Sequence, residues 1–143
     1  MSFVLDASVL VKLVVEEPGS KESREIFRTN VSRGYEPCTV DIALSEIFNA
    51  LWKHVVLTKD LSLEKAWDAI EDLLALWSRL RVVSTSKLFN EAFTTAVKYR
   101  LTFYDSLYIA LAKIVKGELV TADTKLAEVI VANNLCSVRV IAV

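Results

Sequence analysis

Short apolar runs alternate along this chain with longer segments of helical periodicity, and this alternation limits the folds that the chain can adopt. A strand, a helix and a second strand form a βαβ unit, and such units build a parallel sheet with helices on its faces. We expect strands at Phe3–Asp6, Tyr35–Thr39, Arg81–Ser84, Leu119–Ala122 and Val138–Val143. All five are short and mostly apolar, as strands buried on both faces should be. The pattern therefore predicts an α/β fold around a parallel sheet.

About seven helices are expected between and after these strands. Two of them stop at residues that end helices well, the first before Pro18-Gly19 and the second at Gly34. The middle of the chain predicts a helical hairpin with a turn near Thr58-Lys59-Asp60. The expected helices are Ser8–Val15, Ser20–Arg33, Asp41–Leu57, Ser62–Leu80, Ser86–Tyr99, Phe103–Lys116 and Thr124–Asn133.

The second helix of the hairpin carries more apolar residues than one core-facing stripe requires. Its apolar positions include Leu63, Trp67, Ile70, Leu74 and Trp77. Core packing accounts for most of this set, and the remainder is available for a dimer or partner surface.

Length and composition favour a single domain over residues 1–143 in the cytoplasm. A chain of 143 residues is long enough to bury a core without disulfides or a structural metal. The apolar N-terminal stretch is too short to span a membrane, and Cys38 and Cys136 follow no zinc-ligand spacing. The net charge of −1 predicts that any contact with nucleic acid is local.

Four acidic residues, Asp6, Glu46, Asp105 and Asp123, each lie beside or within an apolar run. Burying a carboxylate is costly unless it is hydrogen-bonded, paired or bound to a cation. Each acid also has a local explanation: Asp6 and Asp123 as helix N-caps, Asp105 in a capping-box-like pattern, and Glu46 on a polar helix face.

Taken together, the four acids predict a metal site. Asp6 and Asp123 follow the first and fourth expected strands, and the carboxyl ends of parallel strands meet at one sheet edge, where ligands bind. Two negative charges about 5 Å apart repel by roughly 3 kcal/mol at an effective dielectric near 20. A divalent cation relieves that repulsion, and ligands that are all oxygens favour Mg²⁺ or Mn²⁺. A water bound to such an ion can attack a phosphodiester.

Three further side chains are candidate supporting groups. The Ser8 hydroxyl is two residues after Asp6 and can orient its carboxylate, while Lys12, one helical turn later, can meet a phosphate. Thr121 shares a strand side with Asp123 and suits a hydroxyl that orients the acids. Each has a plain alternative: Ser8 as an ordinary helix residue, Lys12 as a solvated side chain, and Thr121 as a surface-facing strand residue. His54, the only histidine, is expected to be a packed or surface residue, and no Gly-rich nucleotide loop is present.

These residues resemble the PIN-domain ribonucleases and, among them, the VapC-like toxins of toxin–antitoxin pairs. Four segments spread over nearly the whole chain carry the resemblance. They are Val4-Leu5-Asp6-Ala7-Ser8 with Lys12, the segment 45–51 around Glu46, the segment 104–112 that begins Tyr104-Asp105, and Leu119-Val120-Thr121-Ala122-Asp123.

The resemblance implies a five-stranded parallel sheet of order 3-2-1-4-5, with Asp6, Glu46, Asp105 and Asp123 around Mg²⁺ or Mn²⁺. It implies endonucleolytic hydrolysis of RNA, and it matches Asn49 to a polar position on the helix of Glu46. It also implies a homodimer and a small antitoxin that covers the acidic groove. The RNA contacts are left to guesses by position, namely Lys12, Lys53, Lys98, Arg100 and Lys125.

Two other hypotheses compete with a ribonuclease toxin. One is a PIN-like fold kept as a non-catalytic module that binds RNA or protein. The other is a receiver-type signalling domain, whose acidic pocket also holds Mg²⁺. That fold needs a pair of acids after the first strand, but here Ser2 and Phe3 precede an isolated Asp6.

Overall fold

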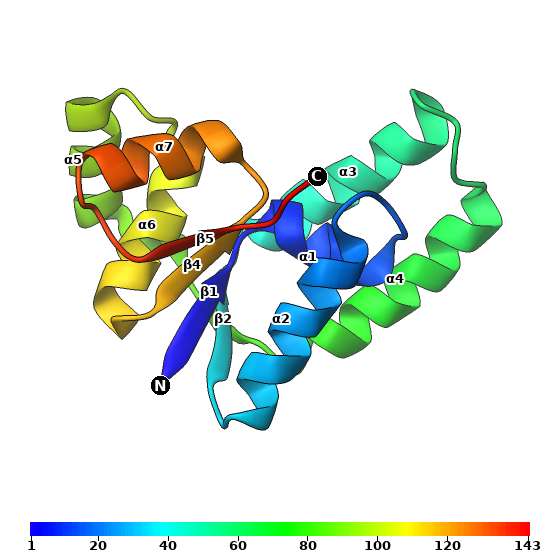
Figure 1. The fold of residues 1–143 in the computed structure, drawn as a ribbon. Helices are drawn as coiled ribbons and strands as arrows, with labels where there is room; N and C mark the ends of the chain where they lie inside the picture. Colours follow the sequence, from blue (N-terminus) through cyan, green and yellow to red (C-terminus); the bar gives the residue numbers. More distant parts are fainter.

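Five parallel strands in the order β3-β2-β1-β4-β5 form the centre of the computed structural model, which describes residues 1–143 (Figure 1). This is the sheet order that the resemblance implies. The strands differ from the expected ranges by one to three residues at their ends. They are β1 (Ser2–Leu5), β2 (Glu36–Val40), β3 (Arg81–Val83), β4 (Glu118–Thr121) and β5 (Val138–Val140).

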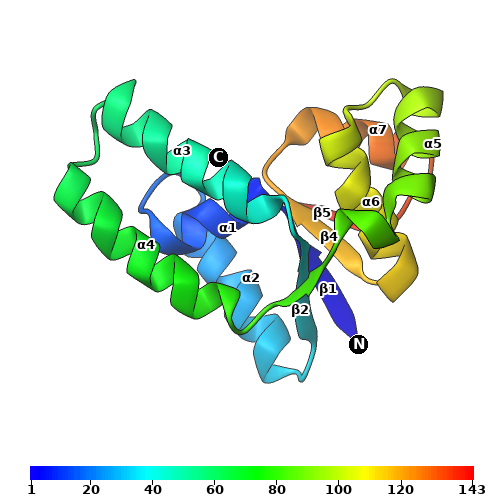
Figure 2. The ribbon, with the colours of Figure 1, turned by 180° about the vertical axis from the view of Figure 1, so that it is seen from behind.

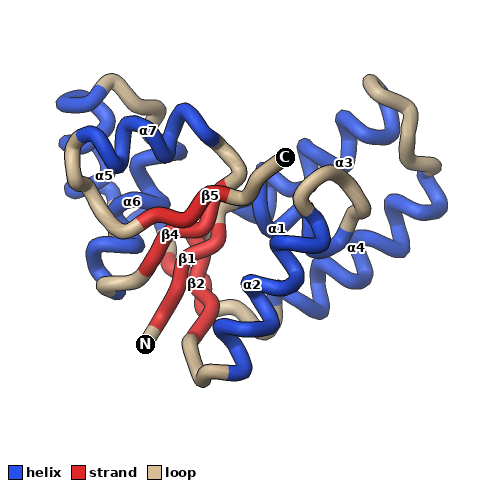
Figure 3. Tube along the Cα trace, viewed as in Figure 1, coloured by secondary structure: helices blue, strands red, loops and turns tan.

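Helices cover both faces of this sheet (Figure 3). On one face lie α1 (Ala7–Val14), α2 (Ser20–Ser32), α3 (Ala43–Val56) and α4 (Leu63–Trp77), and on the other lie α5 (Phe89–Tyr99), α6 (Phe103–Val115) and α7 (Thr124–Ala132). None of them combines the length and apolar character needed to cross a lipid bilayer.

The most deeply buried elements are β1 and α6. Phe3, Val4 and Leu5 of β1 have exposed fractions of 1% or less, because the strand has neighbours on both sides and helices on both faces. Residues 106–112 of α6 are all buried, since the helix packs across β1, β2 and β4. The core therefore centres on β1, the strand that Asp6 follows, and on α6, which packs against it.

One expected helix divides in two. In place of one helix over Ser86–Tyr99, a short 3₁₀ turn spans Thr85–Lys87 and α5 follows from Phe89 onward. Leu88 lies between them with 1% of its surface exposed. Its backbone (φ −118°, ψ −10°) ends the 3₁₀ turn and begins α5.

The expected hairpin is formed by α3 and α4, which project together away from the sheet and pack on α1 (Figure 2). The wide apolar set of α4 divides between core and solvent. Ala66, Ala69 and Leu73 are buried. The larger Leu63, Trp67 and Leu74 are between 52% and 62% exposed. The excess apolar surface that the sequence indicated is therefore on the outside of the hairpin.

Candidate active site

Asp6 and Asp123 lie at the carboxyl ends of two adjacent strands. In the β1–β4 pair, Leu5 is the partner of Val120, so the chain leaves both strands at the same edge. Both acids are also helix N-caps: Asp6 accepts from the Val9 amide at 3.2 Å and Asp123 from the Leu126 amide at 3.1 Å. The capping and the sheet-edge expectations therefore hold together.

Asp6 is buried, with 5% of its surface exposed, and two hydroxyls hold its carboxylate. Ser8 Oγ donates to Oδ1 and Thr121 Oγ1 donates to Oδ2. The same hydroxyls accept from backbone amides, Ser8 from Ala122 at 3.0 Å and Thr121 from Asp123 at 3.0 Å. Burial raises the pKa of Asp6 to about 6 in spite of these hydrogen bonds. Ser8, which was expected to orient Asp6, and Thr121, which was expected beside Asp123, thus each hold one oxygen of Asp6.

Helix α3 brings Glu46 to the site, and Tyr108 of α6 fixes its position. The Tyr108 hydroxyl, on a side chain that is 2% exposed, donates to Glu46 Oε1 at 2.7 Å. Burial raises the pKa of Glu46, and the charge of Asp105 raises it further, whereas the tyrosine hydrogen bond lowers it. Tyr108 was not among the expected site residues. Its spacing of three residues from Asp105 on one helix face is the signal that points to it.

Asp105 interacts electrostatically with each of the other three acids. It lies in the first turn of α6, where its amide donates to the Thr102 hydroxyl at 3.1 Å. Burial and then the charge of Asp123 raise the pKa of Asp105. The charge of Asp105 in turn raises the pKa of Asp6 and of Glu46. The other three carboxylates are therefore each coupled electrostatically to Asp105.

The charges of the four acids are not neutralised by ion pairs within the protein. None of the four acids forms an ion pair with a lysine, an arginine or the histidine. As the side chains stand, no three of them are close enough together to share a metal ion. Carboxylate oxygens without a cationic partner nevertheless have the chemistry that Mg²⁺ and Mn²⁺ prefer.

A cavity of about 480 Å³ opens directly beside Glu46, between α1, α3 and the start of α6. Asn49, the expected polar residue of α3, lines this cavity and is exposed. Ser8 lines it from α1, which connects the cavity to Asp6. Its full lining is Ala7, Ser8, Val11, Ile42, Ser45, Glu46, Asn49, Ala50, Lys53 and Tyr104.

The family model of the PIN domain matches residues 3–131, which include all four acids. This chain belongs to the PIN domain family. It is 36% identical over 131 residues to Ribonuclease VapC3 of Pyrobaculum aerophilum, covering 90% of this chain and 94% of that protein.

Solved structures agree with this assignment. The crystal structure of PAE2754 from Pyrobaculum aerophilum has a TM-score of 0.65 and 25% identity, covering 90% of this chain and 86% of the other. A toxin–antitoxin complex from Klebsiella pneumoniae contains a chain with a TM-score of 0.59 and 17% identity, covering 87% and 88%. The second likeness shows the fold alone.

In this PIN domain, Lys12 lies in a cluster apart from the four acids. Lys12 is 8% exposed and its Nζ pairs with Glu17 Oε1 at 2.9 Å, so its ammonium is engaged with a carboxylate instead of facing a phosphate. An ammonium buried to this extent requires a counter-charge. His54 bonds Glu17 Oε2 at 2.9 Å and Asp60 at 2.8 Å. His54 is therefore a partner in an ion-pair network rather than a plain packed residue.

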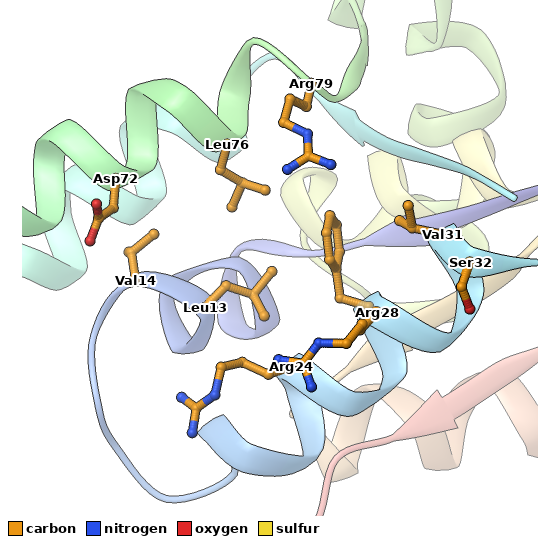
Figure 4. Close-up of a pocket in the computed structure, with 10 residues that line it drawn as sticks. Leu13, Val14, Arg24, Arg28, Val31, Ser32, Asp72, Leu76 and Arg79 are labelled. Atoms are coloured by element: carbon orange, nitrogen blue, oxygen red, sulfur yellow. The ribbon is translucent and has the colours of Figure 1, made fainter. Parts of the chain in front are cut away.

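A second hollow of about 450 Å³ lies between α1, α2 and α4 of the PIN domain (Figure 4). Leu13, Val14 and Leu76 are among its apolar residues, and the guanidinium groups of Arg24, Arg28 and Arg79 lie around them. Only Arg24 forms an ion pair, with the exposed Glu16 at 2.9 Å. The hollow, here called the arginine groove, combines apolar residues with three arginines and one acid, Asp72 of α4.

Proposed function

We propose that this PIN domain is a metal-dependent endoribonuclease that hydrolyses phosphodiester bonds of RNA. The observation that carries the proposal is the placement of four carboxylates without an ion-pair partner: Asp6 and Asp123 follow adjacent strands, and Asp105 interacts electrostatically with Asp6, Glu46 and Asp123. A relative that is 36% identical and bears the name Ribonuclease VapC3 supports the reaction class.

Asp6, Glu46, Asp105 and Asp123 are the residues that would hold Mg²⁺, with Mn²⁺ as a substitute. When bound, the cation supplies neutralisation of phosphate charge and an activated water. The protein's own part is to hold the acids in place. Ser8 and Thr121 fix both oxygens of Asp6, and Tyr108 fixes Glu46. The buried location of Asp6 keeps bulk water from competing for its oxygens.

Cleavage of an unstructured RNA with and without EDTA tests this function. Wild-type protein should cleave with Mg²⁺ or Mn²⁺ and stop when EDTA is added. Asp6→Asn removes a ligand and should lower the cleavage rate by about 1,000-fold, which corresponds to several kcal/mol of transition-state stabilisation.

Asp68→Asn is the matched control, because Asp68 is an exposed acid of α4 outside the site. It should cleave at the wild-type rate. Mn²⁺ should raise the thermal unfolding midpoint of wild type and of Asp68→Asn, but not of Asp6→Asn. Protein that binds RNA and never cleaves it would favour a non-catalytic module instead.

We further propose that the enzyme is the toxin of a toxin–antitoxin pair in the cytoplasm. The arginine groove suits an antitoxin segment with apolar side chains flanked by acids, since apolar residues line it and Arg28 and Arg79 are without ion pairs. Arg28→Glu should weaken inhibition by the cognate antitoxin. Arg33→Glu, on the same helix end but outside the groove, should not.

A homodimer is the proposed assembly of this toxin. The exposed apolar side chains of α4, Leu63, Trp67 and Leu74, offer a surface for it on the outside of the hairpin. Analytical ultracentrifugation of wild type and of Trp67→Glu tests this assembly. A wild-type monomer at micromolar concentration would contradict it.

A further inference from the structure

We infer that the cavity beside Glu46 is a subsite for one unpaired nucleotide of the substrate, whose base stacks on Tyr104. This inference rests on the proposed ribonuclease function and adds a residue that the four acids do not explain. The volume of about 480 Å³ falls in the range of about 300–1,000 Å³ that is usual for small-ligand pockets.

The position of Tyr104 is the first argument for a stacking surface. Tyr104 is adjacent to Asp105 in the first turn of α6, it lines the cavity, and its side chain is 59% exposed. An aromatic ring open to solvent gains little from core packing. Beside a site for RNA cleavage it offers a flat face for a base, and bases of single strands stack on such rings.

The residues of α3 that line the cavity provide the second argument. Ser45, Asn49 and Lys53 are spaced four residues apart on α3, so they form one polar stripe along the cavity. All three are exposed, and neither the Asn49 amide nor the Lys53 ammonium has a partner among the hydrogen bonds and ion pairs of the protein. An amide can bond a base edge, and an ammonium can meet a phosphate.

The location of the cavity next to the acids is the third argument. Glu46 is part of its wall, and Ser8 links that wall to Asp6. A nucleotide between Tyr104 and the α3 stripe would therefore be next to the phosphodiester at the four acids. The subsite would select unpaired RNA, because a base within a duplex has both faces covered by its neighbours.

Substitution of Tyr104 combined with removal of single bases tests the subsite. Tyr104→Ala should weaken binding of an unstructured RNA oligonucleotide by about 5- to 150-fold, whereas Tyr104→Phe should bind within about 3-fold of wild type. Phe93→Ala is the matched control, since Phe93 is 62% exposed on α5 and lies outside the cavity. It should bind as wild type does.

The deciding measurement replaces each nucleotide of the oligonucleotide in turn with an abasic one. At one position near the cleaved bond, loss of the base should remove the difference between wild type and Tyr104→Ala. Binding is measured by fluorescence anisotropy on the Asp6→Asn background, and kcat/KM is measured on the cleaving protein. Wild-type protein that cleaves RNA while Tyr104→Ala behaves as Phe93→Ala does would overturn the subsite alone. Base-dependent binding through Tyr104 without any cleavage would support the subsite and contradict the ribonuclease.

Discussion

Two buried or nearly buried carboxylates in this PIN domain, Asp6 and Glu17, are stabilised in opposite ways. One oxygen of Glu17 pairs with the Lys12 ammonium at 2.9 Å, and the other lies 2.9 Å from the His54 ring, which is a cation when protonated. Asp6 has only hydroxyl and amide donors, and the negative charge of Asp105 raises its pKa further.

The difference separates a structural carboxylate from a candidate metal ligand. The Glu17 cluster is complete within the chain and ties the segment after α1 to α3 and to the turn before α4. No positive charge of the protein pairs with Asp6 and the acids around it, so a bound divalent cation would reduce the repulsion between them. Substitutions in the two places should therefore affect different properties of the protein.

The largest expected effect is on stability, in Glu17→Gln. This change keeps the shape of the side chain but leaves the ammonium of Lys12, whose side chain is 10% exposed, without its carboxylate. The free energy of unfolding should fall by about 3 kcal/mol, as it does when one partner of a buried ion pair is removed. Urea denaturation measures the loss.

Two other variants sharpen that result. Glu16→Gln is the matched control, because Glu16 is 76% exposed and pairs with Arg24 at the surface, where the expected loss is below about 1 kcal/mol. Asp6→Asn should cost less than Glu17→Gln: its amide nitrogen cannot accept from one of the two hydroxyls, but the change also removes a buried charge that has no cationic partner. Equal losses in Glu17→Gln and Asp6→Asn would contradict the distinction between the two carboxylates.

A smaller effect is expected from Thr121→Val, and it should fall on the metal. The change removes the hydroxyl that donates to Asp6 Oδ2 while it keeps the shape of a fully buried side chain. The Mn²⁺ concentration that gives half-maximal cleavage should rise by about 10- to 100-fold, as for other residues that orient metal ligands.

Thr39→Val provides the control for this metal effect. Thr39 is equally buried, but its hydroxyl donates to the Leu5 carbonyl at 2.8 Å and to no acid. It should lose about 1 kcal/mol of stability and keep the wild-type Mn²⁺ dependence. The same shift in both variants would mean that Thr121 acts through the sheet and not through Asp6.

Strand-end position was the part of the site that the sequence could predict. Asp6 and Asp123 follow apolar runs that only a buried parallel strand explains, so their place at the sheet edge follows from the pattern. The hydroxyls of Ser8 and Thr121 are within two residues of an acid along the chain. Short separations of this kind leave few alternatives for the side chain.

The partners that were not predicted are distant in the sequence. His54 and Glu17 are 37 residues apart, and Tyr108 and Glu46 are 62 residues apart. Such pairs depend on how the hairpin packs on α1 and how α6 crosses the sheet, which periodicity does not specify. Lys12 is an example. Its spacing from Ser8 suggested a contact with a phosphate, but in the structure its ammonium pairs with Glu17 of the loop after α1.

The smallest expected effect is the pH dependence that His54 adds to the Glu17 cluster. Burial alone lowers the pKa of His54, but its hydrogen bonds to Asp60 and Glu17 outweigh burial and raise that pKa above its ordinary value of 6.5. A raised pKa in the folded state means that the stabilisation is complete below pH 6.5 and is lost as pH rises through the raised value. The unfolding free energy of wild type minus that of His54→Gln should thus decline over this window, by up to about 1 kcal/mol. Urea denaturation of both proteins at a series of pH values measures it. A difference that grows with pH would mean that His54 is neutral in the folded protein and that Glu17 depends on Lys12 alone.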